Sequence, residues 1–68
     1  MNIENIVVGE TYSTGWGQID PDLALVKVVH LFFNEEWDDW CIQAKSVNAP
    51  NIGDKTYTFV PDNLEPVS

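Results

Sequence analysis

Leu23-Ala24-Leu25-Val26-Lys27-Val28-Val29-His30-Leu31-Phe32-Phe33 is the longest apolar run in this chain of 68 residues. It is rich in β-branched side chains, and Lys27 and His30 alone interrupt it, so the polar spacing of an amphipathic helix is absent. The run therefore predicts a central strand that is apolar on both faces. A short chain can cover both faces by bending a few antiparallel strands into a small barrel, with this strand paired along both edges.

Size and charge limit the classes of function that the chain can serve. Residues 1–68 make one domain of modest stability, because so small a domain buries only about 60% of its unfolded surface. Eleven acidic residues against three lysines give a net charge of −8, which repels nucleic acid and anionic lipid. We expect no direct nucleic-acid or membrane partner, and instead a protein partner with a basic or partly apolar surface.

Cysteine usage and the absence of apolar leader patterns bear on the compartment. Cys41 is the single cysteine, so an internal disulfide is impossible and a reducing cytoplasm is the simplest location. Residues 1–5 lack the basic and apolar pattern of a signal peptide, and no stretch approaches the roughly 20 apolar residues of a membrane span. We expect a cytoplasmic protein.

The chain before the central strand reads as one strand followed by turns. Residues 5–12 begin apolar and then alternate, which predicts a strand with a bend or bulge at Gly9. Residues 13–18 place two glycines around Trp16 and predict a turn. Residues 19–22 close this loop, because Pro21 cannot donate a hydrogen bond to a sheet.

The chain after the central strand alternates between turn residues and strand patterns. Four carboxylates around one tryptophan predict a solvated turn over residues 34–39. The expected elements that follow are a strand over 40–47, a loop over 48–54, a strand over 55–60, a tight turn over 61–64 and a short edge strand over 65–67. The fold class predicted is all-β, with five strands.

The stretch from Trp40 to Val67, with its WCIQAKS strand, YTFV strand and PDNLEPV ending, resembles the C-terminal half of the Src-homology-3-like barrel. The resemblance implies a five-stranded, strongly bent barrel with a 3-10 turn before the last strand. It implies a core containing Ile42, Ala44, Phe59 and either Leu64 or Val67. It would also place Trp40 and Pro61 in an aromatic groove for polyproline segments, with Tyr12 alone standing for the tyrosine-rich motif of that groove. Small bacterial and phage barrels of this shape include adaptors.

No set of residues in the sequence has the spacing of an enzyme or metal site. His30 lies in mid-strand with no nucleophile fixed near it, and Cys41 is best explained as a small packed side chain among acidic neighbours. Asp20 and Asp22, and the carboxylates of residues 35–39, lack the alternation and central glycine of a calcium loop. We therefore expect no enzyme, no metal and no cofactor.

Three tryptophans are more than so short a chain needs for its core, and exposed tryptophan marks contact surfaces. Trp37, inside the acidic turn, is either an exposed anchor for a partner or a plug for one end of the barrel, and Trp40 is core or groove wall. The predicted partner-binding residues are Trp37, Glu35, Glu36, Asp38, Asp39, Trp16, Trp40 and Tyr12.

Two functions of different classes fit these observations. The first is a non-enzymatic protein-binding module, acting as an adaptor or as a subunit. The second is a phage-encoded inhibitor that imitates the charge of nucleic acid and blocks a host nuclease, polymerase or defence protein. A homo-oligomeric role also stays open, because the 44% apolar content could include an exposed patch.

Overall fold

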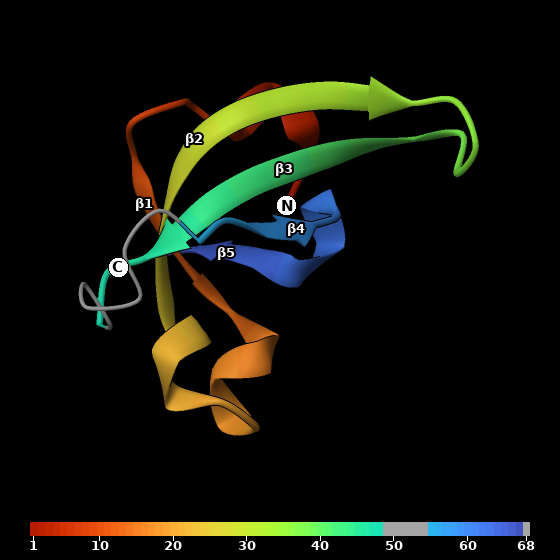
Figure 1. Cartoon of the computed structure of the whole chain (residues 1–68). Coiled ribbons are helices and arrows are strands. Elements are labelled where there is room, and N and C mark those ends of the chain that lie inside the picture. Colours follow the sequence, from red (N-terminus) through yellow and green to blue (C-terminus); the bar gives the residue numbers. More distant parts are fainter. Residues whose placement is uncertain (49–54, 68) are drawn as a thin grey trace.

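The computed structural model, which describes residues 1–48 and 55–67, contains one antiparallel sheet of five strands in the order β4-β3-β2-β1-β5 (Figure 1). The strands are β1 (Thr11–Thr14), β2 (Leu25–Asn34), β3 (Asp39–Ser46), β4 (Tyr57–Phe59) and β5 (Leu64–Pro66). The short 3-10 turns are η1 (Ile3–Asn5), η2 (Gly15–Gln18), η3 (Pro21–Leu23) and η5 (Pro61–Asn63). The predicted all-β class, with a 3-10 turn before the last strand, is confirmed.

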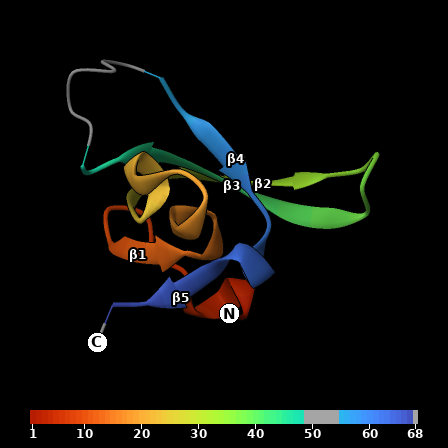
Figure 2. The same ribbon diagram turned by 90° about the horizontal axis from the view of Figure 1, so that it is seen from below.

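Strand β2 is the strand around which the sheet is built, as the sequence predicts. One edge pairs with β1, where Thr11 faces Lys27, and the other pairs with β3 along almost its whole length. A β-bulge between Val28 and His30 shifts the register with β3, and bulges bend a strand and increase its twist. Beyond this bend, β2 and β3 continue as a hairpin that projects from the rest of the molecule (Figures 1 and 2).

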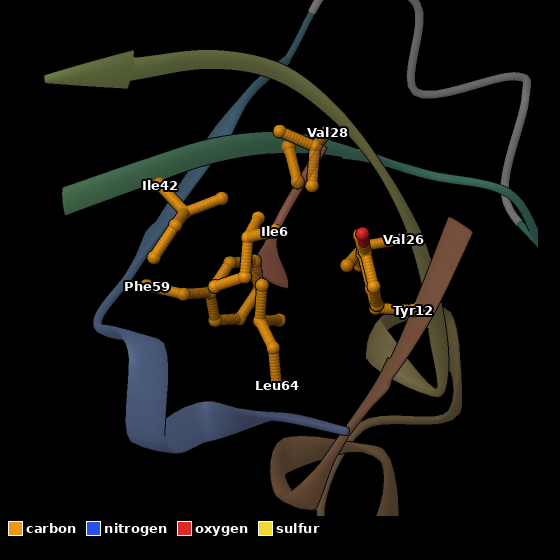
Figure 3. Close-up of a cluster of buried hydrophobic side chains, with 8 residues drawn as sticks. Ile6, Tyr12, Val26, Val28, Ile42, Phe59 and Leu64 are labelled. Atoms are coloured by element: carbon orange, nitrogen blue, oxygen red, sulfur yellow. The ribbon is translucent and has the colours of Figure 1, made fainter. Parts of the chain in front are cut away.

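Eight of the buried side chains form one cluster inside the curved sheet (Figure 3). Its members are Ile6, Tyr12, Val26, Val28, Ile42, Ala44, Phe59 and Leu64. The four predicted core residues Ile42, Ala44, Phe59 and Leu64 are among them, while Val67 is 53% exposed, which decides between Leu64 and Val67. The prediction that both faces of β2 are covered is wrong, because Lys27 and Val29 on its outer face are exposed.

The segment before β1 is the largest correction to the predicted strands. The sequence predicts a strand over residues 5–12, whereas the sheet strand is β1 and residues 6–10 form an irregular connection after η1. Gly9 adopts the left-handed region with φ of 94°, and its N–H donates to Val28 O at 2.8 Å. The Tyr12 hydroxyl accepts from Val7 N and donates to Asn5 O. At these two residues a side chain, and not a neighbouring strand, bonds to the backbone.

The remaining boundaries differ from prediction by a few residues. Strand β2 begins two residues later than predicted, because Asp20 caps η3 by accepting from Asp22 N, and Leu23 belongs to that turn. The solvated turn before β3 is confirmed, and β4 is shorter than the predicted strand over 55–60. The predicted loop over 48–54 lies, from residue 49 on, outside the described residues.

Glycine 17 allows η2 and the residue after η3 to approach each other closely. A Cβ at Gly17 would lie 2.6 Å from Ala24 Cα, whereas a Cβ at Gly15, in the same turn, would meet no atom within 4 Å. Gly17→Ala must therefore separate the two turns, and we expect it to lower the free energy of unfolding by about 1–3 kcal/mol. Thermal melting checks this, with Gly15→Ala as the matched control; equal melting of the two variants would contradict the close approach.

Candidate functional site

An open groove of about 270 Å³ runs between the β1–β2 connection and the turn that joins β2 to β3. Trp16 of η2 and Trp37 of the turn both line it, together with residues of β4 and η5. We call it the two-tryptophan groove, and its lining residues are Trp16, Leu23, Trp37, Tyr57, Thr58, Phe59, Val60 and Asn63. Two predicted partner-binding residues, far apart in sequence, thus line the same groove.

Trp16 lies in the connection between β1 and β2, which is stabilised by hydrogen bonds among its own residues. The Thr14 hydroxyl donates to Leu23 O at 2.7 Å, which ties the start of η2 to the end of η3. The backbone N–H groups of Ile19 and Asp20 both donate to Trp16 O. These bonds keep η2 and η3 side by side, as both views show, and leave the Trp16 side chain 47% exposed (Figures 1 and 2).

Trp37 lies in a turn whose backbone is fixed by its own polar side chains. Asn34 Oδ1 accepts from Glu36 N at 2.9 Å, and Asp39 Oδ1 accepts from Trp40 N at 2.8 Å. Asp38 has φ of 51°, a left-handed conformation that aspartate tolerates better than most residues. The Trp37 side chain is 58% exposed and lies outside the core cluster, so it is not a plug of the barrel end.

Four carboxylates flank Trp37 in the sequence of this turn. Glu35, Glu36, Asp38 and Asp39 are all exposed. The turn therefore presents four negative charges next to an exposed aromatic ring at one side of the groove. It is the arrangement that the sequence predicts for the edge of a binding surface.

Two other predicted partner-binding residues lie elsewhere. The Trp40 ring is 39% exposed and packs edge-on against Phe33, with ring centroids 5.7 Å apart, on the projecting hairpin rather than in the core or the groove wall. Tyr12 is a correction, because its ring is only 6% exposed and packs in the core. Since its hydroxyl also bonds to Val7 and Asn5, Tyr12 cannot present a surface to a partner.

A second hollow of about 290 Å³ adjoins the groove and was not predicted from the sequence. It is lined by Gly15, Trp16, Ile19, Asp62, Asn63 and Glu65, and it shares Trp16 and Asn63 with the groove. We call it the acidic hollow. The sequence signal that could have found it is Ile19, an apolar residue between glutamine and aspartate in a predicted loop. In the structure its side chain is 78% exposed.

The residues considered for catalysis occupy ordinary structural positions. His30 is exposed on β2 and its ring stacks on Phe32, with centroids 5.9 Å apart. Cys41 is a free thiol with a fully buried side chain. Within residues 1–48 and 55–67, no three His, Cys, Asp or Glu side chains gather where they could hold a metal ion. The resemblance implies that Pro61 lies with Trp40 in an aromatic groove for polyproline segments; in the structure its carbonyl accepts from Met1 N, and neither residue lines the two-tryptophan groove.

Comparison with known proteins leaves the groove as the main guide to function. No family model, curated protein or solved structure matches the chain. In the part of the chain that the structure describes, no helix has the length and apolar character required to cross a membrane.

Proposed function

We propose that this chain is a non-enzymatic, cytoplasmic protein-binding module of the Src-homology-3-like barrel type, acting as an adaptor or as a subunit. The order of β3, β4, η5 and β5 is the order that the sequence resemblance implies for the C-terminal half of such a barrel. The observation that carries the function is the two-tryptophan groove, because exposed aromatic rings that line one concavity are typical of contact surfaces.

The charge of the module defines the chemistry of its partner. The net charge is −8, and carboxylates lie beside the groove in the turn that carries Trp37. A partner segment with basic residues would be attracted over long range, and its apolar side chains would replace water against the tryptophan rings. The partner is therefore a protein whose surface is basic and partly apolar.

The groove favours this function over imitation of nucleic-acid charge. A charge mimic needs carboxylates arrayed like phosphates and has no use for an apolar groove with tryptophans on its sides. Here the densest group of carboxylates is confined to the turn before β3, directly beside Trp37. The same groove would be available to a second copy of the chain, but two copies of charge −8 repel each other.

Selection from a random dodecapeptide library displayed on phage particles tests the proposal. Purified wild-type protein should enrich peptides that combine lysine or arginine with aromatic or aliphatic residues. Trp16→Ala and Trp37→Ala should enrich none of these peptides, because each removes an aromatic ring that lines the groove. Enrichment of the same peptides by both variants, or of none by the wild type, would overturn the proposed function.

The acidic turn should control the rate of association. Replacing Glu35, Glu36, Asp38 and Asp39 by their amides removes the charge and retains side-chain oxygens that can accept hydrogen bonds. We expect slower association with a selected peptide and a weaker dependence of the rate on salt, with little change in dissociation. Stopped-flow tryptophan fluorescence at several salt concentrations measures both rates.

A pair of matched variants separates local steering from total charge. Glu35→Gln with Glu36→Gln changes the turn, whereas Glu4→Gln with Glu10→Gln makes the same change at exposed positions outside the groove. The first pair should slow association more than the second. Equal rates for the two pairs, in proteins that melt normally, would remove the turn from the functional account.

A further inference from the structure

The far end of the β2–β3 hairpin leaves an edge of β2 without a neighbouring strand. We propose that residues 30–34 of this edge pair antiparallel with the same residues of a second copy of the chain, which joins two sheets into one across a two-fold axis at Phe32. Residues 30–34 do not line the two-tryptophan groove. The inference is therefore independent of the proposed function.

The pairing of β2 with its neighbours stops at different residues on its two edges. On one edge, β3 accompanies β2 as far as Asn34. On the other edge, β1 pairs with β2 up to Lys27, and Val28 then bonds through its N–H and its carbonyl to Glu10 and Gly9. Beyond Val28 this edge has no strand partner in the part of the chain that the structure describes. Both views show the end of the hairpin projecting from the molecule (Figures 1 and 2).

The backbone groups of Leu31 and Phe33 point toward the free edge. In an antiparallel pair, successive residues direct their N–H and C=O groups to opposite edges of the strand. Trp40 faces Phe33 in the register, and its N–H donates to Asp39 Oδ1 at 2.8 Å. Since this N–H does not bond to Phe33, both Phe33 and Leu31, two residues earlier on β2, direct their groups away from β3. These two residues thus offer donors and acceptors to a further strand.

The sequence of this edge contains none of the features that usually prevent such pairing. Exposed edges are commonly interrupted by charged side chains, by proline or by a bulge. Residues 28–33, VVHLFF, contain no carboxylate, no lysine and no proline. The bulge between Val28 and His30 lies at the base of the free edge, and beyond it β2 and β3 pair regularly. The opposite edge of the hairpin is protected, because the Asp39 carboxylate occupies the Trp40 N–H.

A two-fold axis at Phe32 brings matching residues together. In an antiparallel pair about this axis, Phe32 faces Phe32 of the second copy, and on each side of the axis a Leu31 faces a Phe33. The outward-pointing groups of Leu31 and Phe33 then exchange hydrogen bonds at both places. The side chains of all three residues form apolar cross-strand pairs, which stabilise a sheet. This self-matching, on an edge without charge to attract a basic protein, favours a second copy as the partner.

The acidic turn decides the direction of pairing. Glu35, its first carboxylate, is three residues beyond Phe32. At about 3.3 Å per residue, an antiparallel pair holds the two copies of Glu35 about 20 Å apart, which is about twice the Debye length in about 0.1 M salt. A parallel pair would place the two acidic turns side by side. The repulsion that remains between two chains of charge −8 is screened by salt, so salt should strengthen the dimer.

Sedimentation equilibrium of the wild-type protein tests for the dimer. Two five-residue segments form a small interface compared with the roughly 1,200–2,000 Å² of stable complexes, so we expect a dissociation constant between about 10 µM and about 1 mM. The average mass should rise from monomer toward dimer between about 5 µM and about 1 mM protein, and it should rise further at higher salt. A monomer at every concentration would overturn the inference.

Two matched glutamate variants locate the contact. Phe33→Glu places a charge on the open edge of β2, whereas Trp40→Glu places the same charge directly opposite, on β3. Each variant removes one ring of the Phe33–Trp40 pair, and both side chains are exposed, so the two variants should melt at similar temperatures. Phe33→Glu should weaken the dimer at least about tenfold, while Trp40→Glu should leave its dissociation constant within about threefold.

Amide hydrogen exchange of the wild-type protein, followed by nuclear magnetic resonance, tests the register without a substitution. The N–H groups of Leu31 and Phe33 should exchange about twofold to tenfold more slowly at about 1 mM than at about 20 µM protein, because the dimer pairs them. The Trp40 N–H, which donates to Asp39 on the opposite edge, should exchange at the same rate at both concentrations.

Several results would contradict the dimer through the β2 edge. A dimer that Phe33→Glu leaves intact, or that Trp40→Glu disrupts as strongly, uses another surface, and the inference is then wrong. It is equally wrong if salt dissociates the dimer, or if the exchange rates of Leu31 and Phe33 do not depend on concentration. Peptide selection at the two-tryptophan groove depends on none of these results, so the proposed function stands or falls separately.

Discussion

Phe59→Ala is expected to unfold most of the protein at room temperature. The Phe59 ring is 3% exposed and belongs to the core cluster between β4 and the rest of the sheet. Loss of a buried phenylalanine ring costs about 3–5 kcal/mol, and a core of this size rarely supplies more than about 3–5 kcal/mol in total. Urea unfolding followed by tryptophan fluorescence should show a midpoint near zero denaturant.

Phe33→Ala is the matched control for this prediction. The Phe33 ring is 46% exposed and packs edge-on against Trp40. An aromatic pair contributes about 0.5–1.5 kcal/mol, so this variant should stay folded and unfold at slightly lower urea. Val28→Ala, at a fully buried position, should fall between the two. If Phe59→Ala and Phe33→Ala unfold at the same urea concentration, the assignment of the core is wrong.

Trp37→Ala is expected to weaken partner binding strongly while the protein melts normally. Trp37 is 58% exposed, so the folded state loses little packing, whereas a central tryptophan anchor typically contributes at least about 2 kcal/mol to binding. The dissociation constant for a selected peptide should therefore rise by roughly thirtyfold or more, chiefly through faster dissociation. Titration calorimetry and a melting curve on the same sample measure both quantities.

Trp40→Ala provides the control, since Trp40 is three residues away and does not line the groove. Its substitution should leave peptide affinity within about twofold of the wild type, while melting falls slightly with loss of the Phe33 contact. A Trp37→Ala variant that binds at full strength, or a Trp40→Ala variant that loses binding, would move the contact surface from the groove to the hairpin.

The fold could be predicted from the sequence where the signal is local. The apolar run over residues 23–33 lacks the polar spacing of a helix and so predicts a long strand. In the structure most of this run forms β2. The Asn34 and Asp38 side chains stabilise the turn that their composition predicts. The alternation of residues 5–12 led to the wrong prediction of a strand over this whole range. The Tyr12 hydroxyl bonds to the backbone of Val7 and Asn5, a contact that sequence periodicity does not reveal.

The candidate site could be predicted only in part. Trp16 and Trp37 stand out individually, because large aromatic side chains in polar turns are rarely all buried. Their meeting across one groove depends on the sheet order and on the bend in β2, which bring the β1–β2 connection, the hairpin turn and β4 together. The acidic hollow likewise arises because β5 returns to pair with β1, which brings Asp62 and Glu65 to η2.

That last pairing has a consequence for how the chain reaches its folded state. Ser13 and Glu65 face each other in the sheet but are 52 residues apart, whereas β2 and β3 are joined by one tight turn. Joining distant segments costs more loop entropy than closing a hairpin, so we expect the β2–β3 hairpin to form early and β5 to pair with β1 late in folding. The acidic hollow, to which β5 contributes Glu65, is therefore expected to form only once this last pairing is made.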